Sequence, residues 1–350
     1  MNINFDKISQ QNLQKSKDNI FKKIDLLRKE ERRLLRRKRI YSGVAASVVF
    51  LIVTGLLYDF KTTSVSALDE FVETSIPESL SNDKVELILS SNEKVELEDS
   101  TKITYSASGN SVRLSSRAQV SEINTENKIS FNTLTVPYGK NTEIQLADGS
   151  KVWLNAGSKL IYPNKFDGDH REVYLEGEAI FDVSHSDKKP FLVKTKACVV
   201  EVLGTLFDVK SYKEDDVVET TLARGKVRVS YLEEGIFGNK KIQEDLSPGN
   251  KAIFYKGKTG FDLETADVSA TMSWRDGYIV FKSEPLDEIL DKLSRYYNVK
   301  FYTSGIINED ARYSGSFYLN DDILNVTKIL TSITDHYCYL DAENQTIIIE

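Results

Sequence analysis

The chain has 350 residues, with 46 Lys and Arg against 53 Asp and Glu, and 40% of its residues are hydrophobic. This length suits two or three domains, and the composition excludes collagen-like, disulfide-scaffold and wholly disordered proteins. Two cysteines are too few for a disulfide framework or a Cys-based zinc site. The charge is uneven: residues 1–40 hold 13 basic and 5 acidic side chains (+8), whereas residues 41–350 hold 33 and 48 (−15).

An uncharged stretch separates the basic part from the acidic part. Residues 41–58 (YSGVAASVVFLIVTGLLY) form a run of 18 residues without a charge, and as a helix they would span roughly 27 Å, close to the hydrocarbon core of a bilayer. Basic residues precede the run and Asp59 follows it. The positive-inside rule therefore predicts a single transmembrane helix with residues 1–40 in the cytoplasm and the acidic part outside.

Two alternatives to a permanent anchor are weaker. A buried core helix fits poorly, because residues 48–53 are apolar on all sides and only one flank of the run is basic. A cleaved signal peptide could end at the small residues 65–67, but a 40-residue leader and an 18-residue apolar run both exceed the usual dimensions.

The basic residues next to this run set topology and contact anionic lipid headgroups in our interpretation. They are Arg32, Arg33, Arg36, Arg37, Lys38 and Arg39. Direct binding of nucleic acid is less favoured, because the basic segment runs straight into the predicted membrane helix.

An apolar stripe lies upstream of the basic residues. The spacing of its members predicts one face of an amphipathic helix. They are Ile20, Phe21, Ile24, Leu27 and Leu34. We predict that this stripe binds a cytoplasmic partner protein, with a second copy of the chain or the membrane surface as alternatives.

After a linker at residues 59–75, residues 76–270 are predicted to form an all-β domain. Glycines recur every 8–11 residues between positions 139 and 177, and Asp148-Gly149 between alternating runs indicates a tight hairpin. Residues 86–105 align with residues 143–162 without a gap, which indicates a repeated hairpin. The repeat favours a stacked, solenoid-like sheet over a closed barrel, and a sandwich stays open.

Residues 273–350 are predicted to form a small α+β domain of order βαβ–βαββ. Strands are expected at residues 278–282, 299–303, 313–319, 337–340 and 346–349. Pro285 lies near the start of the first helix and Asn320 is the predicted N-cap of the second.

No catalytic or metal-binding pattern stands out. His170, His185 and His336 lack metal-ligand spacing, and no phosphate-binding glycine loop occurs. Cys198 is expected to be buried, Cys338 lies in a predicted strand of the other domain, and whether they pair is left open. We therefore expect no enzyme activity and no cofactor.

Seven motifs, in order over residues 133–254, resemble the FecR-type anti-sigma regulators of Gram-negative bacteria. They are residues 135–139 (TVPYG), 146–156 (LADGSKVWLNA), 171–183 (REVYLEGEAIFDV), 189–191 (KPF), 202–209 (VLGTLFDV), 221–227 (TLARGKV) and 246–249 (LSPG). The α+β tail resembles the usual C-terminal domain of that family. Ala147 stands where the family usually has Pro and Asp208 where Asn is common, and 40 residues before the membrane are fewer than the family's usual anti-sigma domain has.

The resemblance implies an inner-membrane protein with a cytoplasmic N-terminus and a periplasmic C-terminus. Its implied partners are the signalling domain of a TonB-dependent outer-membrane receptor outside, an extracytoplasmic-function sigma factor inside, and a membrane protease. The alternative hypothesis is a membrane-anchored periplasmic β-protein that binds carbohydrate through exposed aromatic rings, since the chain has 17 Tyr and 16 Phe.

Overall fold

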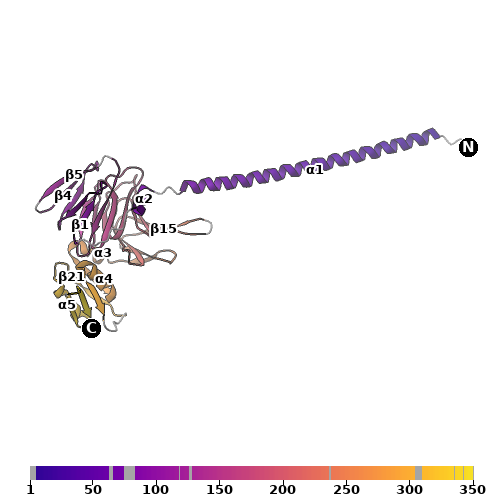
Figure 1. Ribbon diagram of the computed structural model, residues 1–350. Helices are drawn as coiled ribbons and strands as arrows, with labels where there is room; N and C mark the ends of the chain where they lie inside the picture. The colour runs from indigo at the N-terminus through magenta and orange to yellow at the C-terminus, as the bar shows by residue number, and fades with distance from the viewer. Residues whose placement is uncertain are drawn as a thin grey trace. The chain divides into compact units, whose positions relative to one another are not determined.

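The computed structural model describes residues 5–62, 66–74, 83–117, 119–125, 128–235, 238–303, 310–334, 336–341 and 343–349. Two compact units make up the chain, Met1–Ser66 and Ala67–Glu350. The first is helical, and the second contains the β-rich part and the small α+β region (Figure 1).

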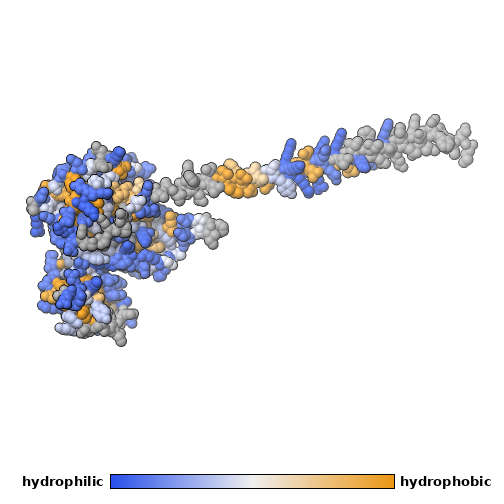
Figure 2. Space-filling view, in the orientation of Figure 1, coloured by the Kyte–Doolittle hydropathy of each residue, from blue (hydrophilic) through white to orange (hydrophobic). Residues whose placement is uncertain are grey.

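One continuous helix, α1 (Phe5–Thr62), covers both the predicted cytoplasmic segment and the predicted membrane segment. Its portion Arg28–Gly55 is long and apolar enough to cross a membrane. Apolar side chains within it are exposed, among them Phe50 (67%) and Leu51 (68%). Figure 2 shows them as a continuous hydrophobic band beside the basic residues. Such a band is stable in lipid and costly in water.

The predicted linker at residues 59–75 contains the end of α1 and a short helix, α2 (Ala67–Thr74). Leu68 of α2 is buried and Phe71 packs on Phe131, with 5.3 Å between the ring centroids. Lys194 Nζ lies 3.0 Å from a carboxylate oxygen of Asp69. This helix is therefore fastened to the β-rich part of the second unit.

The 18 strands of that part form two layers that share one strand, β10 (Arg171–Asp182). In spatial order the first layer is β2 (Lys94–Leu97), β1 (Val85–Ile88), β6 (Phe131–Val136), β9 (Ser158–Pro163), β10, β11 (Phe191–Lys194), β12 (Val199–Val202), β15 (Val227–Glu233) and β16 (Lys240–Leu246). The second layer is β5 (Val120–Asn124), β4 (Ser111–Ser115), β3 (Lys102–Tyr105), β7 (Thr142–Gln145), β8 (Lys151–Leu154), β10, β13 (Leu206–Ser211), β14 (Val217–Arg224), β17 (Asn250–Tyr255) and β18 (Asp262–Thr265).

The layers face each other across one apolar core, and among the described strands both have open edges rather than closing into a barrel. β10 passes from one layer to the other at Gly177, whose φ of 106° lies in the region that glycine tolerates best. Pairings within the layers are antiparallel except β10 with β11 and β3 with β7. The sheet is thus a bent, all-β, half-barrel-like structure.

The predicted repeat is confirmed as two hairpins of the same geometry, β1–β2 and β7–β8. In the first, Asn92 N donates to Leu89 O (2.8 Å); in the second, Gly149 N donates to Leu146 O (2.9 Å). Asn92 and Gly149 both have positive φ. The equivalent residues Tyr105 and Tyr162 touch, with 3.2 Å between their hydroxyl oxygens.

The C-terminal region has the predicted order βαβ–βαββ. It consists of α3 (Val268–Thr271), η1 (Ser273–Asp276), β19 (Tyr278–Glu284), α4 (Leu286–Tyr297), β20 (Lys300–Thr303), β21 (Tyr313–Tyr318), α5 (Ile323–Thr334), β22 (Cys338–Asp341) and β23 (Thr346–Ile349). β19 pairs with β21, and β20, β23 and β22 form a second sheet.

The predicted N-cap of α5, Asn320, is wrong. Asp322 caps this helix instead, because its Oδ1 accepts hydrogen bonds from Leu324 N (2.6 Å) and Asn325 N (3.1 Å). A carboxylate serves this position well, because it also interacts favourably with the helix dipole. Pro285 occupies the N-cap position of α4, close to where the sequence placed it.

The core of the C-terminal region extends onto the outer face of the second layer. Ile180 of β10 is fully buried in it, and Trp153, Leu206 and Ala223 pack against the same cluster. At about 25 cal/mol per Å² of buried apolar surface, this contact stabilises the packing of the C-terminal region on the sheet. We call the contact surface between them the domain seam.

Candidate functional site

Strand alternation builds the sheet side of the domain seam. In β13, Phe207 and Val209 are fully buried in the core between the layers, so Asp208 and Lys210 lie on the outer face. Cross-strand pairing sets Asp208 beside Ile180 and Thr221. The next row along the sheet sets Lys210 between Glu178 and Glu219. A charged patch thus adjoins the apolar contact.

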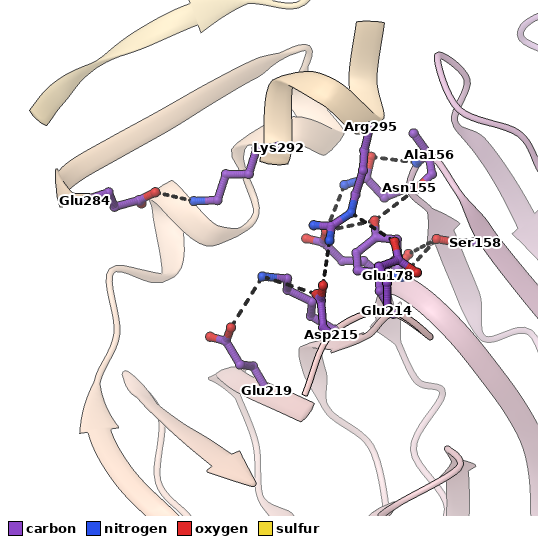
Figure 3. Close-up of polar contacts among 12 residues, drawn as sticks. Asn155, Ala156, Ser158, Glu178, Glu214, Asp215, Glu219, Glu284, Lys292 and Arg295 are labelled. Carbon is purple, nitrogen blue, oxygen red and sulfur yellow. Dashed lines mark hydrogen bonds and ion pairs between the residues drawn. The ribbon is translucent and has the colours of Figure 1, made fainter. Parts of the chain in front are cut away.

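Arg295, in the last turn of α4, ties the C-terminal region to this patch (Figure 3). Its Nη2 donates to Asp215 Oδ1 (2.7 Å), its Nε lies 3.6 Å from Glu214 Oε1, and its guanidinium stacks 4.0 Å from the Tyr212 ring centroid. Its side chain is only 12% exposed. The backbone adds a bond, because Gly139 N donates to Arg295 O (2.9 Å).

Tyr212, on which Arg295 stacks, also forms hydrogen bonds with residues of the sheet. Its hydroxyl donates to Ala156 O (2.9 Å) and lies 3.3 Å from Glu178 Oε2. Asn155 Nδ2 donates to the same carboxylate oxygen (3.0 Å). Burial, together with the Glu178 charge, raises the pKa of Tyr212 well above its ordinary value, so this hydroxyl stays a donor.

A second group of charges lies beside the first. The Glu219 carboxylate forms salt bridges with the ammonium groups of Lys210 (N–O distance 3.5 Å) and Lys251 (3.4 Å). Lys292 of α4 forms a salt bridge with Glu284 (2.5 Å). Burial acts to raise the pKa of Glu219, but the two ammonium groups lower it by more, so the net direction is down. This carboxylate is therefore ionised and fixed in the network.

A cavity of about 270 Å³ lies at the domain seam. Asp208 and Trp274 are among its lining residues, and each has a buried polar atom, Oδ1 and Nε1 respectively, without a hydrogen-bond partner among the described residues. Burial is the main cause that raises the pKa of Asp208 well above its usual value; the charges of Glu178 and Glu219 add to it and Lys210 opposes it. An unpaired buried carboxyl group takes its neutral form under these conditions.

We expect this carboxyl group to make folding stability fall as pH rises. Between the ordinary pKa of 3.8 and the raised folded-state value, the folded protein holds a proton that the unfolded chain has lost, so unfolding becomes easier by at most about 1.4 kcal/mol per pH unit. Asp208→Asn should remove this slope. Urea unfolding of both proteins from pH 4 to 8 checks it, and parallel stability curves would contradict the assignment.

The predicted partner-binding stripe lies on α1. Leu34 is 60% exposed, whereas the side chains of Ile20, Phe21, Ile24 and Leu27 lie outside the described residues. The six basic residues from Arg32 to Arg39 are all exposed. The partner-binding role of the stripe and the lipid-contacting role of the basic residues therefore remain predictions. The domain seam does not test either of them.

The structure also locates the residues examined for chemistry. Cys198 and Cys338 are both free and buried, so they do not form a disulfide. Within the described residues no group of three or more His, Cys, Asp or Glu side chains is arranged to hold a metal.

The domain seam is not evident from the sequence. In the sequence Arg295 is an ordinary basic residue near a helix C-terminus, and Asp208 differs from other core-strand residues only as a departure from a family pattern. One signal is present in the sequence: Asp208 and Lys210 alternate with the apolar residues Phe207 and Val209 in a strand otherwise typical of a core. Alternation of this kind marks a polar outer face, but it does not say what covers that face.

Comparisons with known proteins agree with this architecture. Family models described as "FecR protein" and "FecR, C-terminal" match residues 132–228 and 278–349. No curated protein matches the chain.

Two crystal structures of a candidate anti-sigma factor from Parabacteroides distasonis ATCC 8503 are similar to it, with 28% and 27% sequence identity and a TM-score of 0.55 for each. They cover 62% and 63% of this chain, and 98% of the solved chain in each case. These similarities support an anti-sigma or sensor role. The chain therefore contains a FecR domain followed by a FecR C-terminal domain.

Proposed function

We propose that this chain is a single-pass inner-membrane anti-sigma factor that relays a signal from a TonB-dependent outer-membrane receptor to an extracytoplasmic-function sigma factor. The main support is the pair of FecR and FecR C-terminal domains in order, together with the similarity to solved candidate anti-sigma factors. α1 supports the membrane part, because Arg28–Gly55 could span a bilayer.

In this proposal the N-terminus is cytoplasmic, since the exposed basic residues from Arg32 to Arg39 precede the apolar stretch. Residues 1–40 then face the sigma factor, and the acidic second unit faces the periplasm. The basic residues contact lipid headgroups rather than nucleic acid.

Recognition of the receptor's signalling domain would use protein surface rather than catalysis. Among the described strands, β20 pairs only with β23, and β21 pairs only with β19, so each has one edge without a neighbouring strand. An open edge can accept a strand from a partner, with backbone hydrogen bonds supplying affinity. Such a protein transmits a signal by binding and requires no enzyme activity of its own.

Within the described residues one helix could cross the membrane, so it has no second spanning helix there to move against. A membrane protease that cuts the chain, or a change in oligomeric state, is therefore the simpler means of passing the signal inward. Binding of carbohydrate is less favoured, because the largest fully buried side chains include the aromatic rings of Tyr162, Phe181, Phe191 and Phe207.

The apolar stripe on α1 provides the test. We expect the double substitution Ile24→Asp and Leu27→Asp to abolish regulation of the sigma factor, because two charges on an apolar contact face remove its hydrophobic complementarity. Sigma-dependent transcription in the cell, together with co-purification of the sigma factor, measures the effect.

The matched control is Lys22→Asp with Lys23→Asp, which adds acidic residues to the same helix at exposed positions outside the stripe. This control should keep regulation. Unchanged transcription in the Ile24 and Leu27 variant would remove the stripe from the proposal, and unchanged transcription on deletion of the whole gene would remove the anti-sigma function.

A further inference from the structure

The cavity at the domain seam has walls from both domains. β10, β13, β14 and β17 contribute one wall, and α4 contributes another through Glu288, Lys292 and Arg295. Its volume of about 270 Å³ is several times the roughly 30 Å³ that one water molecule occupies in the liquid. It therefore has room for a small organic molecule.

The cations that line this cavity all have ion-pair partners, whereas some of the lining carboxyl groups do not. Each lining cation has a carboxylate within 4.0 Å; the cations are Lys210, Lys251, Lys282, Lys292 and Arg295. Three lining carboxyl groups have no cationic nitrogen within that distance among the described residues, namely Glu178, Asp208 and Glu288. The cavity thus has carboxyl groups without a cationic partner but no cation without a carboxylate, and a cation placed beside Asp208 would favour the ionised form of its carboxyl group.

Asp208 is the residue that indicates a ligand most directly. It is 2% exposed, it lies on the cavity side of β13, and its Oδ1 has no partner among the described residues. A buried polar group without a hydrogen-bond partner destabilises the folded state, so a partner for it would be favourable. Cross-strand pairing of β10 with β13 places Glu178 one row away on the same face.

The lining also includes an aromatic surface. Trp274 is 6% exposed, lines the cavity, and leaves its indole Nε1 without a partner in the described part of the chain. Carboxylates beside an aromatic ring are the groups that recognise an organic ammonium ion. A bare metal ion fits less well, because no group of three His, Cys, Asp or Glu side chains within the described residues could hold one.

We propose that the seam cavity binds a small primary amine, whose ammonium group is received by Asp208 and Glu178. This proposal does not depend on the proposed sigma-factor and receptor contacts. Because its walls come from both domains, an occupant contacts the sheet and α4 together and stabilises their packing.

The test is calorimetric titration of the detergent-solubilised full chain at pH 7 with n-butylamine, and with n-butanol and butyrate as neutral and anionic molecules of similar size. We expect saturable binding of the amine alone. Asp208→Asn keeps the shape of the side chain and should weaken amine binding about tenfold or more, the effect of losing one hydrogen bond to a charged group.

Asp182→Asn is the matched control. This residue lies on the same face of β10, is partly exposed, pairs with Arg224 and does not line the cavity, so its variant should bind the amine as the wild type does. Glu178→Gln is the second test variant, with urea unfolding to verify that each variant is folded. The proposal is overturned if butylamine gives no saturable heat, if butanol binds equally well, or if both carboxyl variants keep full affinity.

Discussion

Replacing Arg295 by alanine is expected to lower the free energy of unfolding of the second unit by about 3–5 kcal/mol, the usual cost of removing one partner from a buried ion pair. Its guanidinium contacts Asp215 and stacks on Tyr212, and both are largely inaccessible to solvent. The alanine variant leaves the Asp215 carboxylate buried without its nearest cation. Urea unfolding of the full chain in detergent measures the loss.

Arg228→Ala is the matched control for this prediction. Arg228 makes two hydrogen bonds to Asp245, of 2.7 and 3.0 Å, but both side chains are well exposed. Exposed pairs contribute little to stability, so this variant should unfold nearly as the wild type does. Equal losses in the two variants would mean that the domain seam does not depend on Arg295.

The second large effect is expected at Gly177, where β10 passes between the layers. A Cβ atom added there would lie 2.4 Å from Ser158 Oγ and 2.6 Å from Ser158 Cα, and the residue has φ 106°. Steric overlap and an unfavourable backbone conformation together should cost Gly177→Ala about 2–5 kcal/mol. Urea unfolding of the full chain in detergent measures this loss in the free energy of unfolding.

Gly168→Ala separates the two contributions. Gly168 also has a positive φ, 78°, but a Cβ atom there would meet nothing within 4 Å. This control should lose only the backbone contribution, roughly 1–2 kcal/mol. If both alanine variants lost the same stability, the close approach of Ser158 to Gly177 would not constrain the fold.

The local elements could be predicted because their signals are local. Asp148-Gly149 between alternating runs predicts a hairpin wherever it occurs, and the offset of 57 residues identifies its copy at β1–β2. The face of α4 follows in the same way: Leu286, Ile289, Leu290 and Leu293 share one side of a helix and all four are buried. Such patterns depend on a few neighbouring residues only.

The domain seam could not be predicted, because it depends on which face of which strand the C-terminal region covers. Asp208 and Lys210 lie on a polar strand face that would suit open solvent equally well, and Arg295 meets Asp215 across 80 positions of sequence. The sequence also does not show that the N-terminal segment and the membrane segment form one continuous helix. The sequence divides residues 1–58 by a change of environment from charged to apolar, whereas α1 continues through it without a break.

The shared strand β10 connects two contacts of the second unit that lie far apart in sequence. At about 3.3 Å per residue, its 12 residues extend roughly 40 Å. Near its start, Glu172 forms an ion pair with Lys194, and Lys194 also forms an ion pair with Asp69 of α2. Beyond Gly177, the same strand contributes Glu178 and Ile180 to the domain seam. Because β8, β9, β11 and β13 all pair with this strand, α2 and the domain seam are connected through one continuous hydrogen-bonded strand rather than through loops.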